Sequence, residues 1–83
     1  MDQIVRTPQQ MGAALRRIRR QRGLSQGELD ARAHLRQATI SEVEAGKGST
    51  RLDTIISIMV ALDLEMVVRL RTSGAPEDIG KVY

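Results

Sequence analysis

The sequence predicts a small all-α domain, a bundle of four to five helices followed by a single strand, on three observations. The chain has 83 residues, which is enough for one hydrophobic core but not for two. Apolar residues recur at helical spacing through most of the chain, between residues that favour helix ends. From Leu64 onward they occur at every second position instead. We therefore expect residues 1–71 to form one domain with a strand at 64–71, and residues 72–83, rich in turn formers, to form a flexible tail.

The composition limits what the protein can be. The chain has no Cys, which excludes a disulfide framework and a Cys-rich zinc site. No apolar run approaches the ~20 residues of a membrane span, and no signal-peptide pattern opens the chain. We therefore expect a soluble cytoplasmic protein that needs no cofactor or metal. The apolar residues are aliphatic except for Tyr83, so a lone monomer would be marginally stable and a partner chain is expected.

The net charge of +3 is distributed unevenly along the chain. Residues 1–36 hold eight Arg against three acidic residues, a net +5, whereas residues 37–65 hold two basic residues against five acidic ones, a net −3. An Arg-rich helix can be merely a solvated surface. It can equally contact phosphates, because the guanidinium fork matches a phosphate bidentately.

A first helix is predicted from Thr7 to about Gly23. Thr7 can act as its N-cap, Pro8 occupies the first position, where its missing N–H costs nothing, and Gln10 can close a capping box. Residues 2–6 are expected to be extended or to form a short strand. The inward face of the helix is an amphipathic stripe of Met11, Ala14, Leu15 and Ile18.

Two shorter helices are expected at about 26–33 and 37–45, with a tight turn between them. Ser25 and Glu28 form a Ser-x-x-Glu capping box, and Gly46 suits the end of the second helix. The inward positions are Leu29, Ala33, Ile40 and Val43. The opposite face of the second helix carries the short polar set Gln37, Ala38, Ser41 and Glu42. Such a face fits a DNA major groove, where amide and hydroxyl groups read base edges.

A last helix is predicted to be capped by Thr50 with Asp53 and to end near Leu62. Its expected inward face consists of Leu52, Ile55, Ile56, Met59 and Leu62. Ile58 lies off this stripe, and we assign it to a second buried contact, between subunits.

The alternating residues 64–71 need a partner strand, because one strand cannot satisfy its own backbone donors and acceptors. Within the chain only the short segment at Ile4 and Val5 is available, and it is a poor match. The better solution is the same strand of a second subunit, paired antiparallel about a two-fold axis. We therefore expect a homodimer whose contacts include Ile58, Leu64, Met66, Val68 and Leu70.

Three segments resemble the helix-turn-helix of phage-repressor-type (Xre-like) regulators: residues 24–29 (Leu-Ser-Gln-Gly-Glu-Leu), 37–41 (Gln-Ala-Thr-Ile-Ser) and 44–46 (Glu-Ala-Gly). This resemblance covers about residues 8–62 and implies a lambda-repressor-like bundle. The flanking residues 4–8 and 62–70 are similar to those of the HipB-like antitoxins. That resemblance implies a DNA-binding dimer that pairs with a HipA-type kinase toxin.

Base contacts are expected from the start of the third helix. Gln37 is the first candidate, because a Gln there can bond bidentately to adenine N6 and N7. Arg36 can reach a guanine or a phosphate, while Ser41 and Ala38 offer a hydroxyl and a small apolar contact. Glu42 could accept from cytosine N4 or pair with an Arg.

Phosphate contacts are expected around this surface. The family resemblance implies that Gln26 touches a phosphate and braces Gln37. Arg17 and Arg20 on the first helix would add affinity for any sequence. Thr39 and Lys47 are further candidates for anchoring the DNA backbone.

The chain departs from the family pattern at three positions. His34 stands where the turn usually has Gly, so a non-Gly residue must take a positive φ or the turn must be looser. Asp30 replaces a small apolar residue that normally packs between helices. Arg36 replaces a capping Ser or Thr. His34 is not expected to bind a metal or act as a base, because the chain has no second His or Cys to support it.

These observations favour a dimeric, sequence-specific DNA-binding repressor that recognises an inverted-repeat operator and serves as the antitoxin of a toxin–antitoxin operon. Two alternatives remain open: a module whose main task is to hold a kinase toxin inactive, and a standalone phage-type repressor without a toxin. An enzyme is not expected, since the chain lacks a Cys nucleophile, a supported His–Ser–acid set and a Gly-rich phosphate loop.

Overall fold

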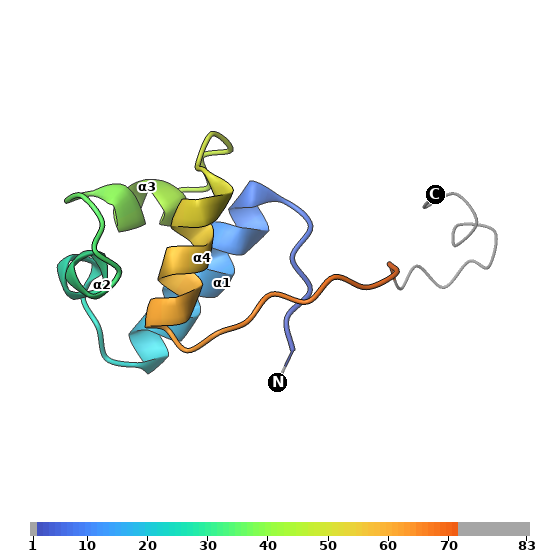
Figure 1. The fold of residues 1–83 in the computed structure, drawn as a ribbon, viewed down its shortest axis with the longest axis horizontal. Helices are drawn as coiled ribbons and strands as arrows, with labels where there is room; N and C mark the ends of the chain where they lie inside the picture. Colours follow the sequence, from blue (N-terminus) through green and yellow to red (C-terminus); the bar gives the residue numbers. More distant parts are fainter. Residues whose placement is uncertain (1, 72–83) are drawn as a thin grey trace.

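The computed structural model describes residues 2–71, which form four helices: α1 (Pro8–Gln21), α2 (Gln26–Arg32), α3 (Thr39–Glu44) and α4 (Leu52–Ala61) (Figure 1). The predicted all-α bundle is therefore confirmed, although α2 and α3 are shorter than expected. The expected tail at 72–83 lies outside the described residues.

Residues 64–71 form no strand in this single chain and extend away from the bundle (Figure 1). The residues before α1 likewise form no strand between positions 2 and 7. A strand exists only with a hydrogen-bonded partner. The strand expected at 64–71 was one that pairs across two subunits, so it stays a prediction about the dimer.

Helix α1 begins as its sequence predicts. The hydroxyl of Thr7 accepts a 3.0 Å hydrogen bond from the Gln10 N–H, and Pro8 follows at the first position. The predicted capping box is not formed, because the Gln10 side chain accepts from the N–H of Arg6 at 2.6 Å and not from that of the N-cap Thr7. At the other end, Gly23 takes a φ of 70°, which ends the helix. The predicted inward stripe is confirmed, with Ala14 and Leu15 buried and Met11 and Ile18 half-buried.

The capping box of α2 is also confirmed. Glu28 N–H donates to the Ser25 hydroxyl, and Ser25 N–H donates to the Glu28 carboxylate, each at 3.0 Å. These bonds, first the one from the Ser25 backbone, lower the pKa of the Glu28 carboxyl below its ordinary value. The start of α2 is thus set by its own sequence.

The hydrophobic core lies where all four helices meet. Its most deeply buried side chains are Leu29, Ile40, Ile58 and Leu62. Ile58 is completely buried in the core of its own chain, so its assignment to a subunit interface is wrong: it has no surface left to offer a partner.

The inward face of α4 also differs from the prediction. Leu52 and Ile56 are 62% and 45% exposed, whereas Ile58 and Met59 are buried. Apolar residues surround much of this helix, so periodicity fits two overlapping stripes and cannot choose between them. The helix also starts one residue later than expected, since Arg51 is its N-cap and Thr50 donates to the Lys47 carbonyl at 3.3 Å instead.

Helices α1 and α3 pack with their backbones almost in contact at Gly12. A Cβ added to Gly12 would lie 2.4 Å from the Val43 carbonyl oxygen and 2.9 Å from that of Glu44. Only Gly permits this approach, which sets the distance from α1 to the end of α3. Among the described residues, no helix combines the length and the apolar character that crossing a bilayer requires.

Gly12→Ala is expected to destabilise the fold by about 1–3 kcal/mol, because the new methyl group meets backbone atoms that cannot move aside cheaply. Urea unfolding followed by circular dichroism would measure the loss. Gly27→Ala, in the first turn of α2, is the matched control: nothing lies within 4 Å of its added Cβ. It should gain about 0.4–1 kcal/mol from reduced freedom of the unfolded chain. Equal stabilities for the two variants would contradict the close helix contact.

Candidate nucleic-acid interface

The turn between α2 and α3 contains two non-Gly residues in the left-handed region. His34 has a φ of 56°, which confirms that a non-Gly residue takes a positive φ there. Ala38 has a φ of 73° and is the N-cap of α3. Gln37 and Ala38 therefore precede α3 instead of forming its first turn. Such conformations cost an L-residue about 1–2 kcal/mol, so surrounding contacts must hold the turn.

Asp30 supplies the main contact that holds this turn. Its side chain is on α2, is almost fully buried, and accepts a 3.0 Å hydrogen bond from the Ile40 N–H. The Ala38 side chain cannot cap α3, so Asp30 caps the helix from across the turn. The Asp30 carbonyl also accepts from the Leu35 N–H at 2.8 Å. Arg36, the expected cap position, lies two residues before the N-cap Ala38, and the acid at position 30 supplies the side-chain cap that Ala38 lacks.

A buried ion pair joins α1 to the end of α3. Arg19 Nε donates to Glu44 Oε2 at 2.6 Å and Nη2 donates to Oε1 at 3.0 Å, a bidentate geometry. The remaining nitrogen, Nη1, donates to the Leu24 carbonyl at 2.7 Å. The two side chains keep only 8% and 4% of their surface exposed. Arg19 therefore anchors the bundle and is not available to a ligand.

Glu44 also holds Gln26, the first residue of α2. Gln26 Nε2 donates to Glu44 Oε1 at 3.1 Å, so the Gln26 amide binds Glu44 and the expected bracing of Gln37 is not what this structure has. Sequence reasoning missed both Arg19 and Glu44. Arg19 looked like one more member of a basic run; its position four residues after Leu15, on the inward side of α1, was the available signal.

The pKa values of this pair follow from burial and hydrogen bonding. Burial alone would raise the pKa of the Glu44 carboxyl, but hydrogen bonds from Arg19 and Gln26 and the charges of Arg19 and Arg16 lower it below its ordinary value. The hydrogen bond to Glu44 raises the pKa of Arg19 against the opposing effect of burial. Both groups are consequently charged at neutral pH.

The residues expected to contact bases lie together around the start of α3. Arg36, Gln37, Ala38 and Glu42 are exposed and Ser41 is half-buried. The Ser41 hydroxyl donates to the Ala38 carbonyl at 2.9 Å, so it would have to rotate to donate to a base. Of the residues expected to contact phosphates, Thr39 is half-buried and the others, Gln26, Arg17, Arg20 and Lys47, are exposed.

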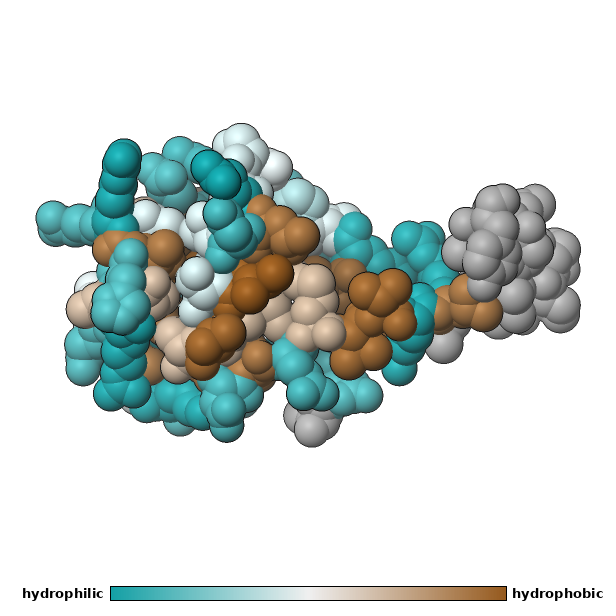
Figure 2. Space-filling view, in the orientation of Figure 1, coloured by the Kyte–Doolittle hydropathy of each residue, from teal (hydrophilic) through white to brown (hydrophobic). Residues whose placement is uncertain are grey.

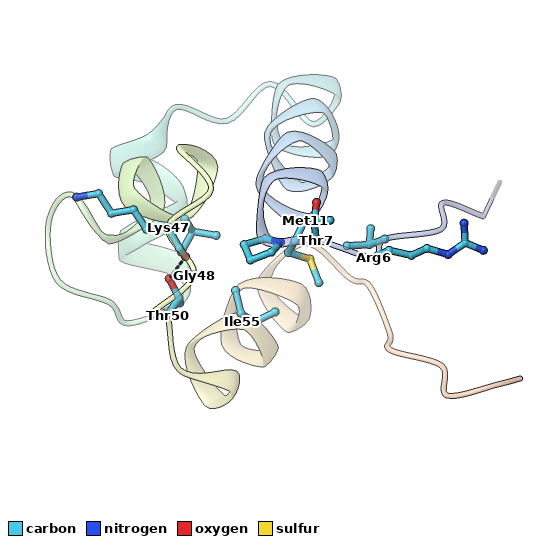
Figure 3. Close-up of a pocket in the computed structure, with 10 residues that line it drawn as sticks. Arg6, Thr7, Met11, Lys47, Gly48, Thr50 and Ile55 are labelled. Atoms are coloured by element: carbon cyan, nitrogen blue, oxygen red, sulfur yellow. Dashed lines mark hydrogen bonds between the residues drawn. The ribbon is translucent and has the colours of Figure 1, made fainter. Parts of the chain in front are cut away.

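A hollow of about 300 Å³ lies elsewhere, between the segment before α1, the α3–α4 loop and α4 (Figure 3). Met11 and Ile55 make it apolar, and the Arg6 and Lys47 side chains point away from it (Figure 3). It brings no charged group to a ligand. Within residues 2–71 there is also no cluster of three His, Cys, Asp or Glu side chains suited to a metal.

Arg19→Met is expected to lower the free energy of unfolding by about 3–5 kcal/mol at pH 7, because it leaves the Glu44 carboxylate buried without its partner. Urea unfolding would measure this loss. The double variant Arg19→Met/Glu44→Leu removes both charges and should recover most of the stability. A single variant as stable as the double variant would contradict a structural role for the pair.

The pair should also make stability depend on pH. Since folding lowers the pKa of Glu44, its contribution is present above the ordinary carboxyl value of 4.5 and is lost as the pH falls through the lowered one. The stability difference between the wild type and the double variant should therefore change below about pH 4.5 and stay constant from pH 5.5 to 7.5.

Comparisons with known proteins agree with this geometry. A family model described as helix-turn-helix matches residues 15–68. Antitoxin HipB of Escherichia coli K12 is 33% identical over 75 residues, which cover 90% of this chain and 85% of HipB. HipB of Escherichia coli O6:H1 is also 33% identical over 75 residues, covering 90% of this chain and 80% of that protein.

Two solved structures are also similar to this chain. A complex of HipB with the O4 20mer has a TM-score of 0.76 at 34% identity, covering 82% of this chain and 96% of that one. A HipA–HipB–O2–O3 complex gives the same TM-score, identity and coverage. The matched proteins are regulators, which confirms the expectation that this chain is not an enzyme. The chain belongs to the helix-turn-helix family and, within it, to the family of the HipB antitoxins.

Proposed function

We propose that the protein is a dimeric, sequence-specific DNA-binding repressor that controls its own operon in the cytoplasm and neutralises a kinase toxin encoded with it. The observation that carries this proposal is the exposed polar edge of α3, which we define as Arg36, Gln37, Ala38, Ser41 and Glu42. Asp30 holds the start of α3 from across the turn, and Glu44 joins the end of α3 to α1 and to the start of α2. A rigid polar edge suits base reading, because each hydrogen-bonding group must meet its base at a defined position.

Base reading is assigned to residues on this edge. Gln37 lies between the two left-handed residues and is exposed, so its amide can bond to adenine. Arg36 would reach a neighbouring guanine or a phosphate. The other proposed base contacts are Ala38, Ser41 and Glu42.

Affinity for the DNA backbone is assigned to the positive charge around this edge. Residues 1–36 carry a net +5, and three of their eight Arg side chains lie exposed on α1. Such contacts do not depend on sequence and weaken with salt. The proposed contacts from the sequence analysis are Gln26, Arg17, Arg20, Thr39 and Lys47.

A second copy of the chain is proposed to cover an exposed apolar surface, which we define as Leu52, Ile56 and Val60 of α4 with Met66, Val67, Val68 and Leu70. The three α4 residues follow one another at four-residue intervals along one side of the helix. In Figure 2 apolar residues run across α4 and onto the segment that follows it. Val60 and Val68 are 71% and 95% exposed, which a small monomer rarely tolerates in one patch. Leu64 is half-buried against its own core and contributes less.

A kinase toxin is the proposed protein partner. HipB occurs with HipA in one of the solved complexes that this chain resembles. The chain covers 85% of the length of HipB of Escherichia coli K12 and so retains most of that relative. These matches favour an antitoxin over a standalone repressor.

Gln37→Ala is expected to weaken binding to the cognate operator by about 1–3 kcal/mol and to relax selection at one base pair. The operator would be an inverted repeat before the gene, with half-site centres about 34 Å or a small multiple apart. Fluorescence anisotropy with this duplex and a random duplex would measure both affinities. Gln21→Ala, an exposed Gln at the end of α1, is the control and should bind both as the wild type does. Equal losses on the two duplexes for Gln37→Ala would remove its base-reading role.

Val60→Glu is expected to shift the chain from dimer to monomer, because a charge would be buried in the proposed apolar interface. Sedimentation equilibrium would measure the molecular mass. Since Val60 is 71% exposed in the single chain, the variant should still fold. Ala31→Glu, on the exposed side of α2, is the control and should remain dimeric. An unchanged dimer in Val60→Glu would place the interface elsewhere.

A further inference from the structure

A second hollow, of about 440 Å³, lies next to the polar edge of α3. Its walls come from three helices and its lining includes both members of the buried ion pair. The lining residues are Arg16, Arg19, Arg20, Gln26, Ser41, Glu44 and Ala45. Since Arg19 and Glu44 are buried while Arg16, Arg20 and Gln26 are exposed, the ion pair forms the floor and the other three form the rim.

The hollow carries an excess of positive charge at its rim. Arg19 is balanced by Glu44 and uses its donors on that carboxylate and on the Leu24 carbonyl. Within residues 2–71, the Arg16 and Arg20 side chains form no ion pair within 4.0 Å and no hydrogen bond of their own. Two guanidinium groups therefore remain to bind an anion beside a floor whose own charges cancel.

We propose that this hollow binds one backbone phosphate of DNA between Arg16 and Arg20. The proposal rests on the proposed DNA-binding function and adds Arg16, which sequence analysis did not single out. Residues four apart share one side of a helix, so Arg16 and Arg20 project together, whereas Arg17 does not line the hollow. A phosphodiester carries one negative charge and presents two oxygens to guanidinium forks, which match them bidentately.

Glu44 and Gln26 also form part of this site, and the hydrogen bonds of Glu44 determine what each can contribute. Glu44 would repel a phosphate if it were unpaired, but Arg19 neutralises it in a bidentate geometry. Glu44 also fixes the Gln26 amide at 3.1 Å. An amide nitrogen has two hydrogens, and this bond uses one, so the second can point to the phosphate. Ser41 belongs to both the hollow and the polar edge of α3, and Gln26 lies beside it. A phosphate bound here would therefore fix the distance between α3 and the bases in the major groove.

The test uses the full chain and a random-sequence 20-base-pair duplex, with affinity measured by fluorescence anisotropy over a series of salt concentrations. Arg16→Ala and Arg20→Ala should each weaken binding severalfold and reduce the slope of log affinity against log salt by about one. Arg16→Lys should keep the slope but still bind more weakly, because it retains the charge and loses the fork. Arg32→Ala, which removes an exposed charge near the end of α2, should match the wild type.

The outcomes separate this proposal from the one on which it rests. If the wild type binds the duplex and Arg16→Ala matches Arg32→Ala in affinity and slope, the hollow is not a phosphate site, and DNA binding stands. If the wild type binds neither this duplex nor the upstream operator region, the proposed function is overturned and the phosphate site with it. Circular dichroism would check that each variant is folded. We expect that it is, because the substituted side chains are exposed and do not contribute to the core.

Discussion

The bidentate ion pair between Arg19 and Glu44 is the interaction on which the candidate interface depends. Removing two charges from water is costly, and such a pair is tolerated only where its geometry is good and its other donors are satisfied. Both conditions hold, since each of the three Arg19 guanidinium nitrogens donates a hydrogen bond, Nη1 to the Leu24 carbonyl, and Gln26 adds a third hydrogen bond to the carboxylate. The pair thereby links α1, the start of α2 and the end of α3. Its value is in fixing these helices relative to one another more than in net stability.

The turn between α2 and α3 is likewise an unfavourable arrangement that contacts from neighbouring helices stabilise. His34 and Ala38 both adopt conformations that favour Gly, at a cost that local sequence does not repay. The hydrogen bond from Ile40 N–H to Asp30 and the burial of Ile40 hold them in place. Strain of this kind persists where the surroundings over-determine the chain, and it often marks a functional segment. Here the strained residues flank Gln37, the side chain proposed to read a base.

The features of the fold and the candidate interface that could be predicted from the sequence are those that depend on residues close together in the chain. Capping residues and Gly act within one turn of helix, so the starts of α1 and α2 and the positive φ at His34 were predictable. Ile58 was misassigned because α4 is apolar on more than one side, and only its packing against α2 shows which side faces inward. Asp30 and Arg19 were not recognised because their partners are 10 and 25 residues away. An acid in a core position and an Arg on an apolar stripe each indicated a buried partner without identifying it.

The apolar character of α4 on two sides connects the proposed dimer to the proposed DNA contacts. A helix that is apolar over most of its circumference is normally buried on every side. The inner side of α4 is covered by the chain's own core through Ile58 and Met59, and the outer side would be covered by a second copy. The inner side packs against α2, from which Asp30 reaches across to hold the start of α3. Packed side chains and one buried hydrogen bond therefore connect the proposed two-fold interface with the edge of α3 that is proposed to read bases. Because the chain has few apolar residues, α4 would serve both the core and the proposed dimer contact, and it would thereby set the spacing between the α3 helices of the two subunits.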